Sequence, residues 1–452
     1  MNLKSHLLGA AASIALVTVA GAASAQNVVE PVQHNHAPVV GQVLINTTGG
    51  GMHIPNGMNA TSLAVGNAIS INVENAAKSI TPATYQRNRS SAPVSASLDV
   101  KVGNATLSGP ATINATAQAQ GNSLATAPTN VGSIKRADIN QWNQGQITST
   151  VSVAATAPMN QLEAVSSAQG NNVFIKAKTI GAGDYIEIEQ DNSGAVTSNL
   201  TIAKGSAFNV LANSDSKINS QAVGNLISLE GTGFVPHGYG QGAYNISIDA
   251  DRLRQENMGK ITANLSIGEA GTGGATEFKK VEASARAIGN VISLTGKNSD
   301  AAHTSVEHVI QKNSGAVSAN AVIRDVNATS ADFSAVAVGN SLSLTGATVN
   351  LGEPGWDKYY GPHGVSQLNT APVTATMTGG GTTSVSGVYN VTAAAMGNVM
   401  SATGTSYTDY NLSQTNMAQV TAVNTFTTTG LNAGTLNVSA QAVGNSFSFT
   451  LK

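Results

Sequence analysis

A ten-residue stretch built around a Gly-Asn pair recurs eight times along this 452-residue chain. One copy reads SQAVGNLISL around Gly224, and another reads AQAVGNSFSF around Gly444, near the last residue. Successive glycines of these pairs lie 55, 49, 54, 65, 50, 58 and 47 residues apart. Similar segments at a near-constant period are typical of repeat proteins, in which each unit stacks on its neighbours. The chain is therefore expected to form one repetitive fold.

A second motif alternates with the Gly-Asn stretch and reads Gln-x-Asn, followed at alternate positions by a small and then a β-branched residue. Its six clear copies begin at Gln141, Gln190, Gln255, Gln311, Gln367 and Gln414. A degenerate copy contains Gln86 and Asn88. Residues 59–452 thus divide into about seven two-motif repeats after an N-terminal half unit.

Both motifs have the two-residue period of β-strands. In the copy around Gly224, one face carries Val223, Asn225, Ile227 and Leu229. The residue two positions after the Asn is large and apolar in all eight copies. That face is therefore the buried one, and the amide of each motif points inward with it.

A buried amide is costly unless its polar atoms are hydrogen-bonded. In a stack of near-identical coils, each amide meets the same amide above and below, so the side chains bond along the stack as ladders. The predicted ladder residues are Asn67, Asn122, Asn171, Asn225, Asn290, Asn340, Asn398 and Asn445, with Gln141, Gln190, Gln255, Gln311, Gln367 and Gln414.

These patterns predict an all-β protein, a repetitive β-solenoid of curlin-like stacked strands with variable loops. The alternative is a string of separate β domains, but about 50 residues with two motif strands are too few for independent cores. The chain has no cysteine, so its core must be stabilised by stacking rather than by disulfides. Whether each repeat makes one or two layers stays open.

The first 25 residues have the features of a secretory signal peptide. Lys4 supplies a positive charge, an apolar run follows from residue 7 to residue 20, and Ala23-Ser-Ala25 fits a cleavage site. The alternative, a membrane anchor, is disfavoured because small and polar residues follow directly. Residues 26–58 are interpreted as a polar lead, in which His34 and His36 are flexible rather than metal-binding.

The Gln, Gly and Asn residues at fixed offsets, following a signal peptide, resemble the curlin repeats of bacterial surface amyloid fibres. The chain is most similar to curli-like surface proteins such as the holdfast-anchoring (holdfast attachment) proteins of stalked alphaproteobacteria. Its repeats are about twice as long as curlin repeats, and its Gly and Asn are adjacent, which puts fibre formation in doubt more than stacking. The resemblance implies export, residence at the cell surface and adhesive or anchoring work without catalysis.

Two loops hold many of the few aromatic residues, which make up 4% of the chain. Both loops fall between a Gly-Asn motif and the next Gln-Asn motif. Aromatic rings beside polar groups suit sugar rings or protein partners. The same residues could instead pack over the edge of the solenoid and order the loops, which is the interpretation we favour. The candidates are Phe234, His237, Tyr239, Trp356, Tyr359, Tyr360 and His363.

The sequence shows little sign of catalytic or metal chemistry. Glu187, Glu189 and Asp191 share one strand face and could bind calcium, but a solvated strand face is the simpler interpretation. No cofactor, metal or catalytic residue is therefore predicted. A net charge of −2 without a basic lobe argues against nucleic acid as a partner.

We therefore expect an exported, non-enzymatic structural protein of the cell surface, associated with the outer membrane. It would anchor an extracellular adhesive or fibre by self-assembly or by docking to a surface partner. Expected partners are other cell-surface or outer-membrane proteins, the protein itself, or an extracellular polysaccharide. The alternatives are a secreted β-helical enzyme acting on polysaccharide and an autotransporter-like passenger.

Overall fold

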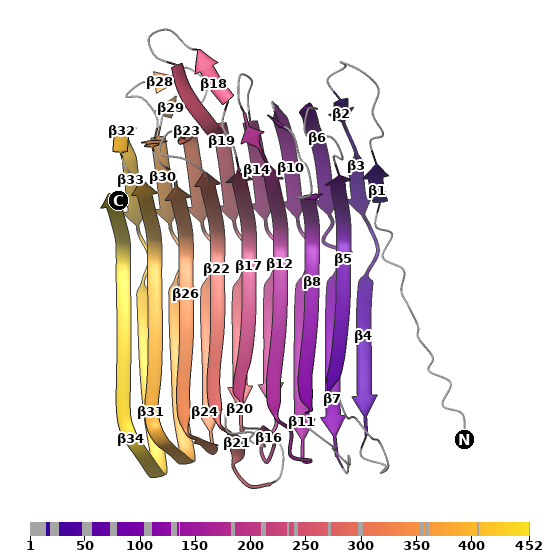
Figure 1. The fold of residues 1–452 in the computed structure, drawn as a ribbon, viewed down its shortest axis with the longest axis vertical. Helices are drawn as coiled ribbons and strands as arrows, with labels where there is room; N and C mark the ends of the chain where they lie inside the picture. The colour runs from indigo at the N-terminus through magenta and orange to yellow at the C-terminus, as the bar shows by residue number, and fades with distance from the viewer. Residues whose placement is uncertain are drawn as a thin grey trace, which may run out of the picture.

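The computed structural model describes residues 15–18, 27–47, 57–72, 79–103, 111–127, 133–134, 136–181, 186–208, 214–232, 235–238, 243–269, 273–296, 302–346, 348–351, 356–357, 361–362, 364–404 and 406–451. Every secondary-structure element in these residues is a β-strand. The structure therefore confirms the all-β solenoid predicted from the repeats. Figure 1 shows the strands side by side in chain order, from the N-terminal to the C-terminal end of the stack.

Each repeat forms one coil with three parts. The first part is the strand of the Gln-Asn motif. These strands are β3 (Val32–Asn35), β6 (Ser79–Asn88), β10 (Ala137–Asn143), β14 (Ile186–Asn192), β19 (Ala243–Asn257), β23 (Ala302–Asn313), β30 (Gly364–Asn369) and β33 (Leu412–Asn416).

The second part follows the small residue of the same motif and continues on the same side of the coil. It is formed by β4 (Val39–Asn46), β7 (Val94–Val102), β11 (Ile147–Ala155), β15 (Val196–Ile202), β20 (Ile261–Ile267), β24 (Val317–Arg324) and the first halves of β31 (Val373–Gly404) and β34 (Val420–Leu451).

The third part is a long strand that carries the Gly-Asn pair near its middle. It is formed by β5 (Met58–Asn72), β8 (Thr112–Ala127), β12 (Gln161–Ala177), β17 (Asp215–Gly231), β22 (Lys280–Gly296), β26 (Ser330–Thr345) and the second halves of β31 and β34. We call this part the Gly-Asn strand. The described residues thus form eight coils, one for each Gly-Asn copy.

Short strands lie mostly in the connections between these parts. They are β1 (Ala15–Thr18), β2 (Asn27–Val29), β9 (Ser133–Ile134), β13 (Thr179–Ile180), β16 (Ala207–Phe208), β18 (Val235–Gly238), β21 (Thr276–Phe278), β25 (Val326–Ala328), β27 (Thr348–Leu351), β28 (Trp356–Asp357), β29 (Gly361–Pro362) and β32 (Ser406–Tyr410).

The strands of successive coils pair in parallel and in register. Asn225 lies opposite Asn171 on one side and Asn290 on the other, and Gln255 lies opposite Gln190 and Gln311. One repeat therefore makes one layer, which answers the question that the sequence left open. The strands form an 18-stranded and a 14-stranded sheet, besides a two-stranded pair of β28 and β29.

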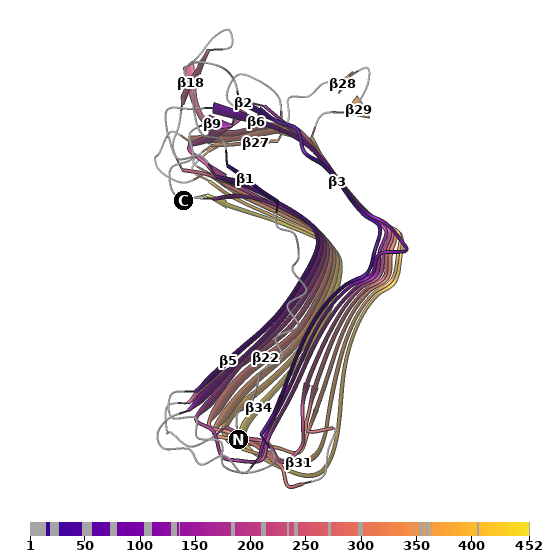
Figure 2. The same ribbon diagram turned by 90° about the vertical axis from the view of Figure 1, so that its right-hand side faces the viewer.

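Each coil is a flattened, bent loop of two facing layers. Figure 2, turned by 90° from Figure 1, shows both layers bending at the same place, with the Gln-Asn strands on the convex side and the Gly-Asn strands on the concave side. We call this bend the elbow. It lies between two separate apolar cores. One contains Leu98, Val151 and Leu200, and the other contains Ile139, Ile188 and Ile227.

The first coil begins earlier than the sequence suggested. Residues 32–46, assigned from the sequence to a polar lead, form β3 and β4 and pair in parallel with β6 and β7. Gln33 and Asn35 lie in register with Gln86 and Asn88, so they are a further copy of the Gln-Asn motif. The segment assigned to the signal peptide contributes β1, which pairs with the end of β5.

Candidate functional site

Three ladders of side-chain amides run the length of the stack through the elbow. The first joins all eight asparagines of the Gly-Asn pairs. Each donates from Nδ2 to Oδ1 of the next asparagine, at 2.7–2.8 Å in every step from Asn67 to Asn445. The structure therefore brings the eight asparagines singled out from the sequence into one column.

The second and third ladders belong to the Gln-Asn motif. Its asparagines form a ladder from Asn35 to Asn416, which also donates toward the C-terminal end. Its glutamines form a ladder from Gln414 back to Gln33, in which each Nε2 donates to Oε1 of the preceding glutamine. The glutamine ladder therefore runs opposite to the two asparagine ladders.

In most of these amides, the second N–H donates to a backbone carbonyl. Gln190 donates to the Leu226 carbonyl at 3.0 Å, within the same coil. Asn225 donates to the Glu256 carbonyl at 2.9 Å, which belongs to the next coil. Asn257 closes the turn after its own strand by donating to the Gly259 carbonyl at 3.0 Å. In Gln190, Asn225 and Asn257, both amide N–H groups and the amide oxygen are thus used, which is what allows such side chains to be buried.

These cross-layer bonds show that the two layers are offset along the stack. Each Gly-Asn strand sits between the Gln-Asn strand of its own coil and that of the next. The pattern stops at the ends. The last Gly-Asn strand, the second half of β34, has β33 on one side and no following coil among the described residues. Likewise β3 and β4 have β5 on one side and no preceding Gly-Asn strand in the described part.

Among the described residues, the core-facing side of the last Gly-Asn strand is exposed. Leu436, Val438 and Phe447 occupy core-facing positions of β34, yet they are 40%, 48% and 40% exposed. The residues paired with them in the preceding coil, Tyr389, Val391 and Met400, are 1%, 1% and 0% exposed. The missing layer therefore leaves an apolar face uncovered.

The N-terminal end shows the same effect more weakly. Val39, Val43 and Ile45 of β4 are only partly buried against the core. Their partners in β7, Val94, Leu98 and Val100, are fully buried. The two ends are therefore stepped, with a convex layer protruding at the first coil and a concave layer protruding at the last.

The acidic strand face that could have bound calcium is occupied by arginines from the next coil. Arg252 pairs with Glu187 and Glu189, at 2.7 and 2.8 Å, and Arg254 pairs with Asp191 at 3.0 Å. Burial raises the pKa of Asp191, and the neighbouring Arg254 opposes this rise. No metal-binding group of three or more His, Cys, Asp or Glu residues occurs within the described ranges.

The two aromatic loops lie mainly outside the described residues. This is so for Phe234, Tyr239, Tyr359, Tyr360 and His363. The structure does place His237 in β18, paired antiparallel with β19 opposite Tyr244. It places Trp356 in β28, opposite Pro362 of β29. Whether these loops bind anything stays a prediction.

The family of the chain follows from comparison with known proteins. A family model for holdfast attachment protein D matches residues 5–237, slightly more than half of the chain. The chain belongs to the holdfast attachment protein D family. No curated protein and no solved structure gives a significant match. The similarity to holdfast-anchoring proteins seen in the sequence is thereby confirmed.

Membership in the holdfast attachment protein D family implies a role in anchoring the holdfast adhesive. That role is by name structural rather than catalytic, and it belongs to the cell envelope or surface. In the described part of the chain, no helix is long and apolar enough to cross a membrane.

Sequence reasoning about this family member missed one of the three ladders. The asparagines of the Gln-Asn motif, from Asn35 to Asn416, were seen in the motif but not assigned to a ladder of their own. The signal was present, because an asparagine follows each glutamine by two residues and therefore shares its buried face. The first copy of the motif, Gln33 and Asn35, lies in the segment that the sequence assigned to a polar lead, where His34 and His36 flank Asn35.

Proposed function

We propose that this holdfast attachment protein is a non-enzymatic, outer-membrane-associated component of the cell surface that anchors the adhesive by stacking end to end with further copies of itself. The proposal is carried by the uncovered apolar face of β34. Core-facing side chains that are buried in every inner coil become exposed only where the next convex layer is missing. The occupant that would bury them is a convex layer of the same kind, and the first coil of a second copy carries one.

The polarity of the ladders supports a head-to-tail arrangement. At the C-terminal end, Asn416 and Asn445 each use one N–H of Nδ2 on a backbone carbonyl, which leaves the second N–H for a further ladder step. Gln414 Oε1 has no donor among the described residues. At the N-terminal end, Asn67 Oδ1 has no donor in the described part, while Gln33 Nε2 uses one N–H on the Ala68 carbonyl. Donors at one end therefore meet acceptors at the other in the Gly-Asn ladder and in the glutamine ladder. In the third ladder, Asn35 Oδ1 at the N-terminal end already accepts the Ala37 N–H at 3.4 Å and would take a second donor.

A head-to-tail contact also satisfies the exposed strand edges. The last coil offers the unpaired backbone edge of β34, which spans 32 residues, and such an edge is a template for a further strand. Because this interface is heterologous and the stack has little reason to close into a ring, it would propagate as a filament. A short filament extending from the envelope would give the adhesive a continuous hydrogen-bonded support.

The test uses two variants, each blocked at one end of the stack. Leu436→Lys/Val438→Lys places charges on the open face of the last coil, and Val39→Lys/Val43→Lys does so at the first coil. Each variant alone should stay monomeric by light scattering, whereas the wild type assembles. An equimolar mixture should form heterodimers and nothing longer, because each partner keeps one free end.

The matched control is Asn437→Lys/Ser439→Lys, which adds the same charges on the outward face of the same strand and should assemble like the wild type. Circular dichroism and thermal melting would show that all variants are folded. A wild type that stays monomeric at every concentration would refute end-to-end stacking. So would single-end variants that assemble as readily as the wild type.

A further inference from the structure

An aromatic and cationic cluster lies on the outer face of the first three Gln-Asn strands, β3, β6 and β10, which are neighbours near the N-terminal end in Figure 1. The register places His34, Arg87 and Trp142 in one column along the stack. The ring of Tyr85 lies 5.5 Å from that of His34 and 5.7 Å from that of Trp142. The Arg87 guanidinium lies 5.6 Å from the centre of the Trp142 ring.

The composition of this column changes along the stack. In the next three coils, the position of Trp142 is taken by Asp191, Glu256 and Lys312, which belong to ion pairs. The aromatic rings are therefore confined to the first coils and are not a general property of the outer face. A solvated strand face does not need Tyr85, Trp142 and Arg87 side by side, with a second arginine, Arg89, just after the end of β6.

Two donors in the cluster lack an acceptor. Trp142 Nε1 and Arg89 Nε are buried and have no hydrogen-bond partner within the described part of the chain. Arg87 donates from both Nε and Nη2 to a single acceptor, Gln144 Oε1, at 3.2 and 3.0 Å. Its Nη1 has no acceptor in the described part of the chain. A buried donor without an acceptor is costly. Arg87 is only partly buried, so its unused N–H groups can meet oxygen atoms from outside the chain.

We propose that this face binds an acidic polysaccharide, with sugar rings packed on Tyr85 and Trp142 and carboxylates paired with Arg87 and Arg89. Aromatic rings offer flat apolar faces to the C–H faces of sugars. Guanidinium groups match carboxylates in shape and charge. The carboxylate oxygens of such a chain would supply an acceptor for Arg87 Nη1.

A polysaccharide fits the cluster better than a protein partner does. Trp, Tyr and Arg are also common in protein interfaces, but such an interface takes about 20–30 residues on each side. This cluster consists of a few side chains on three strands, one of which, β3, has four residues. A narrow stripe along the stack suits a linear chain of sugars.

The inference deepens the proposed function and rests on it, because an anchor needs a contact with the adhesive as well as a support. It does not depend on end-to-end stacking, since the cluster is on an outer face and not at the exposed face of β34. The binding test therefore uses the C-terminally blocked variant Leu436→Lys/Val438→Lys. Failure of stacking and failure of sugar binding would then be seen in separate measurements.

The probe is an oligogalacturonate, compared with the same oligomer after reduction of its carboxyl groups. Calorimetry measures affinity. Fluorescence locates the site, because the chain has two tryptophans and Trp356→Phe leaves Trp142 as the reporter. We expect the acidic oligomer to bind and to change the Trp142 emission, and Arg87→Gln/Arg89→Gln to weaken binding by at least about tenfold. Trp142→Phe keeps an aromatic ring but removes the indole N–H, and it should weaken binding less.

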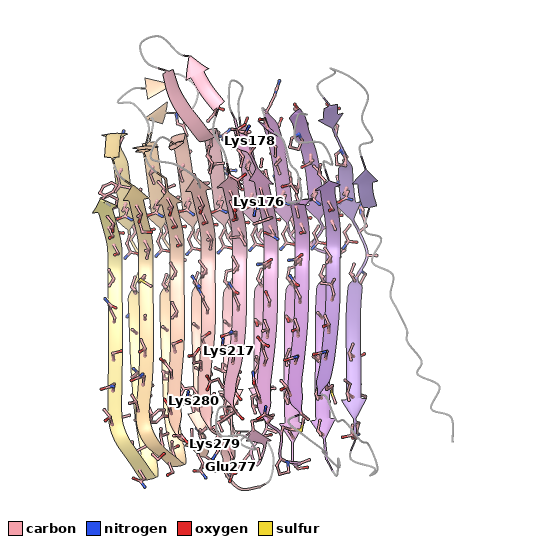
Figure 3. The ribbon with its side chains drawn as sticks, viewed as in Figure 1. Lys176, Lys178, Lys217, Glu277, Lys279 and Lys280 are labelled. Carbon is pink, nitrogen blue, oxygen red and sulfur yellow. The ribbon has the colours of Figure 1, made fainter. Side chains whose placement is uncertain are left out.

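The charge-matched control is Lys178→Gln/Lys217→Gln, which removes two positive charges far from the cluster. Figure 3 shows Lys178 near the top of the view and Lys217 in the lower arm, both midway between the first and the last coil. This control should bind within about twofold of the parent, because exposed charges at a distance are screened by salt. Equal binding of the carboxyl-reduced oligomer, unchanged binding by the arginine variant, or no change in Trp142 emission would each overturn the proposal.

Discussion

At the scale of the single residue, this fold depends on buried amides whose hydrogen-bonding groups are all used. Asn290 accepts from Asn225, donates to Asn340 at 2.8 Å and donates to the Lys312 carbonyl at 2.9 Å. An isolated β-sandwich has no means of satisfying such a side chain so completely. The repeated asparagine on an apolar face was therefore sufficient to predict stacking from the sequence.

Replacing an interior ladder residue should cost more than replacing a terminal one. Asn290→Leu leaves Asn225 without its acceptor, Asn340 without its donor and the Lys312 carbonyl without its partner, so we expect a loss of about 1–3 kcal/mol in the free energy of unfolding. Asn445→Leu, at the exposed end, breaks the bond from Asn398 and the exposed bond to the Gln414 carbonyl, and it should cost less than about 1 kcal/mol because both groups can turn to water. Urea titration of both variants measures the difference.

The exposed control for this comparison is Ser314→Ala, which lies on the turn after a Gln-Asn strand and should change stability little. If Asn290→Leu and Asn445→Leu unfold at the same urea concentration as the wild type, the ladders contribute nothing and the prediction is wrong.

At the scale of the element, the elbow is the feature that the sequence predicted least. The two-residue period correctly gave the strands, and the buried face that follows each Gly-Asn pair. It did not give the face before the pair, where Ser220 and Ala222 are buried although they have the opposite parity to Asn225. It did not give the bend, because the bend depends on how closely two layers approach at one glycine. A Cβ on Gly224 would lie 2.5 Å from the Gly289 carbonyl oxygen and 2.7 Å from Asn257 Oδ1. Both contacts come from other coils, so no local pattern could reveal them.

This close approach predicts that a single methyl group disrupts the elbow. Gly224→Ala should lower the free energy of unfolding by about 1–3 kcal/mol, because neither a backbone carbonyl nor a ladder amide can move freely. Gly274 is the matched control, since a Cβ there would meet nothing within 4 Å. Gly274→Ala should leave stability nearly unchanged, and thermal melting of both variants checks the contrast. Equal melting temperatures would mean that the elbow is looser than the structure shows.

The offset between the layers was also beyond sequence reasoning. The motifs alternate in the same order whether a Gly-Asn strand faces one Gln-Asn strand or sits between two. The bonds from Asn225 to the next coil and from Gln190 to its own coil decide between these arrangements. The step at β4 could be recognised only once the first coil was placed.

At the scale of the whole molecule, the stack is a one-dimensional array in which each coil contacts its two neighbours. Insertions between motifs change the spacing from 47 to 65 residues without shifting the register of the amides. The stability of such an array is approximately a sum over coils and the interfaces between them. The loops are therefore free to vary in length, while the elbow residues are fixed by the ladder on each side.

This modularity predicts that one whole coil can be removed. Deleting residues 291–340 joins Asn290 to Ser341, which takes the place of Val291 because Asn290 and Asn340 are partners in register. The ladders can then close from Gln255 to Gln367 and from Asn257 to Asn369, with one step fewer in each. We expect a cooperatively folded protein of seven coils, with a melting temperature a few degrees lower, because one interface is lost and the rest are kept.

Its control is deletion of residues 291–315, about half as long, which joins Asn290 to a strand of the wrong layer and removes Gln311 and Asn313, so that Gln255 and Asn257 lose their ladder partners. That variant should fail to fold as a continuous stack, because the buried amides on either side of the junction lose their partners. Both end coils are intact in the whole-coil deletion, so it should still assemble with itself by light scattering. If the two deletions melt alike, or if the seven-coil variant is unfolded, the coils are not interchangeable layers. The fold would then depend on contacts specific to each repeat.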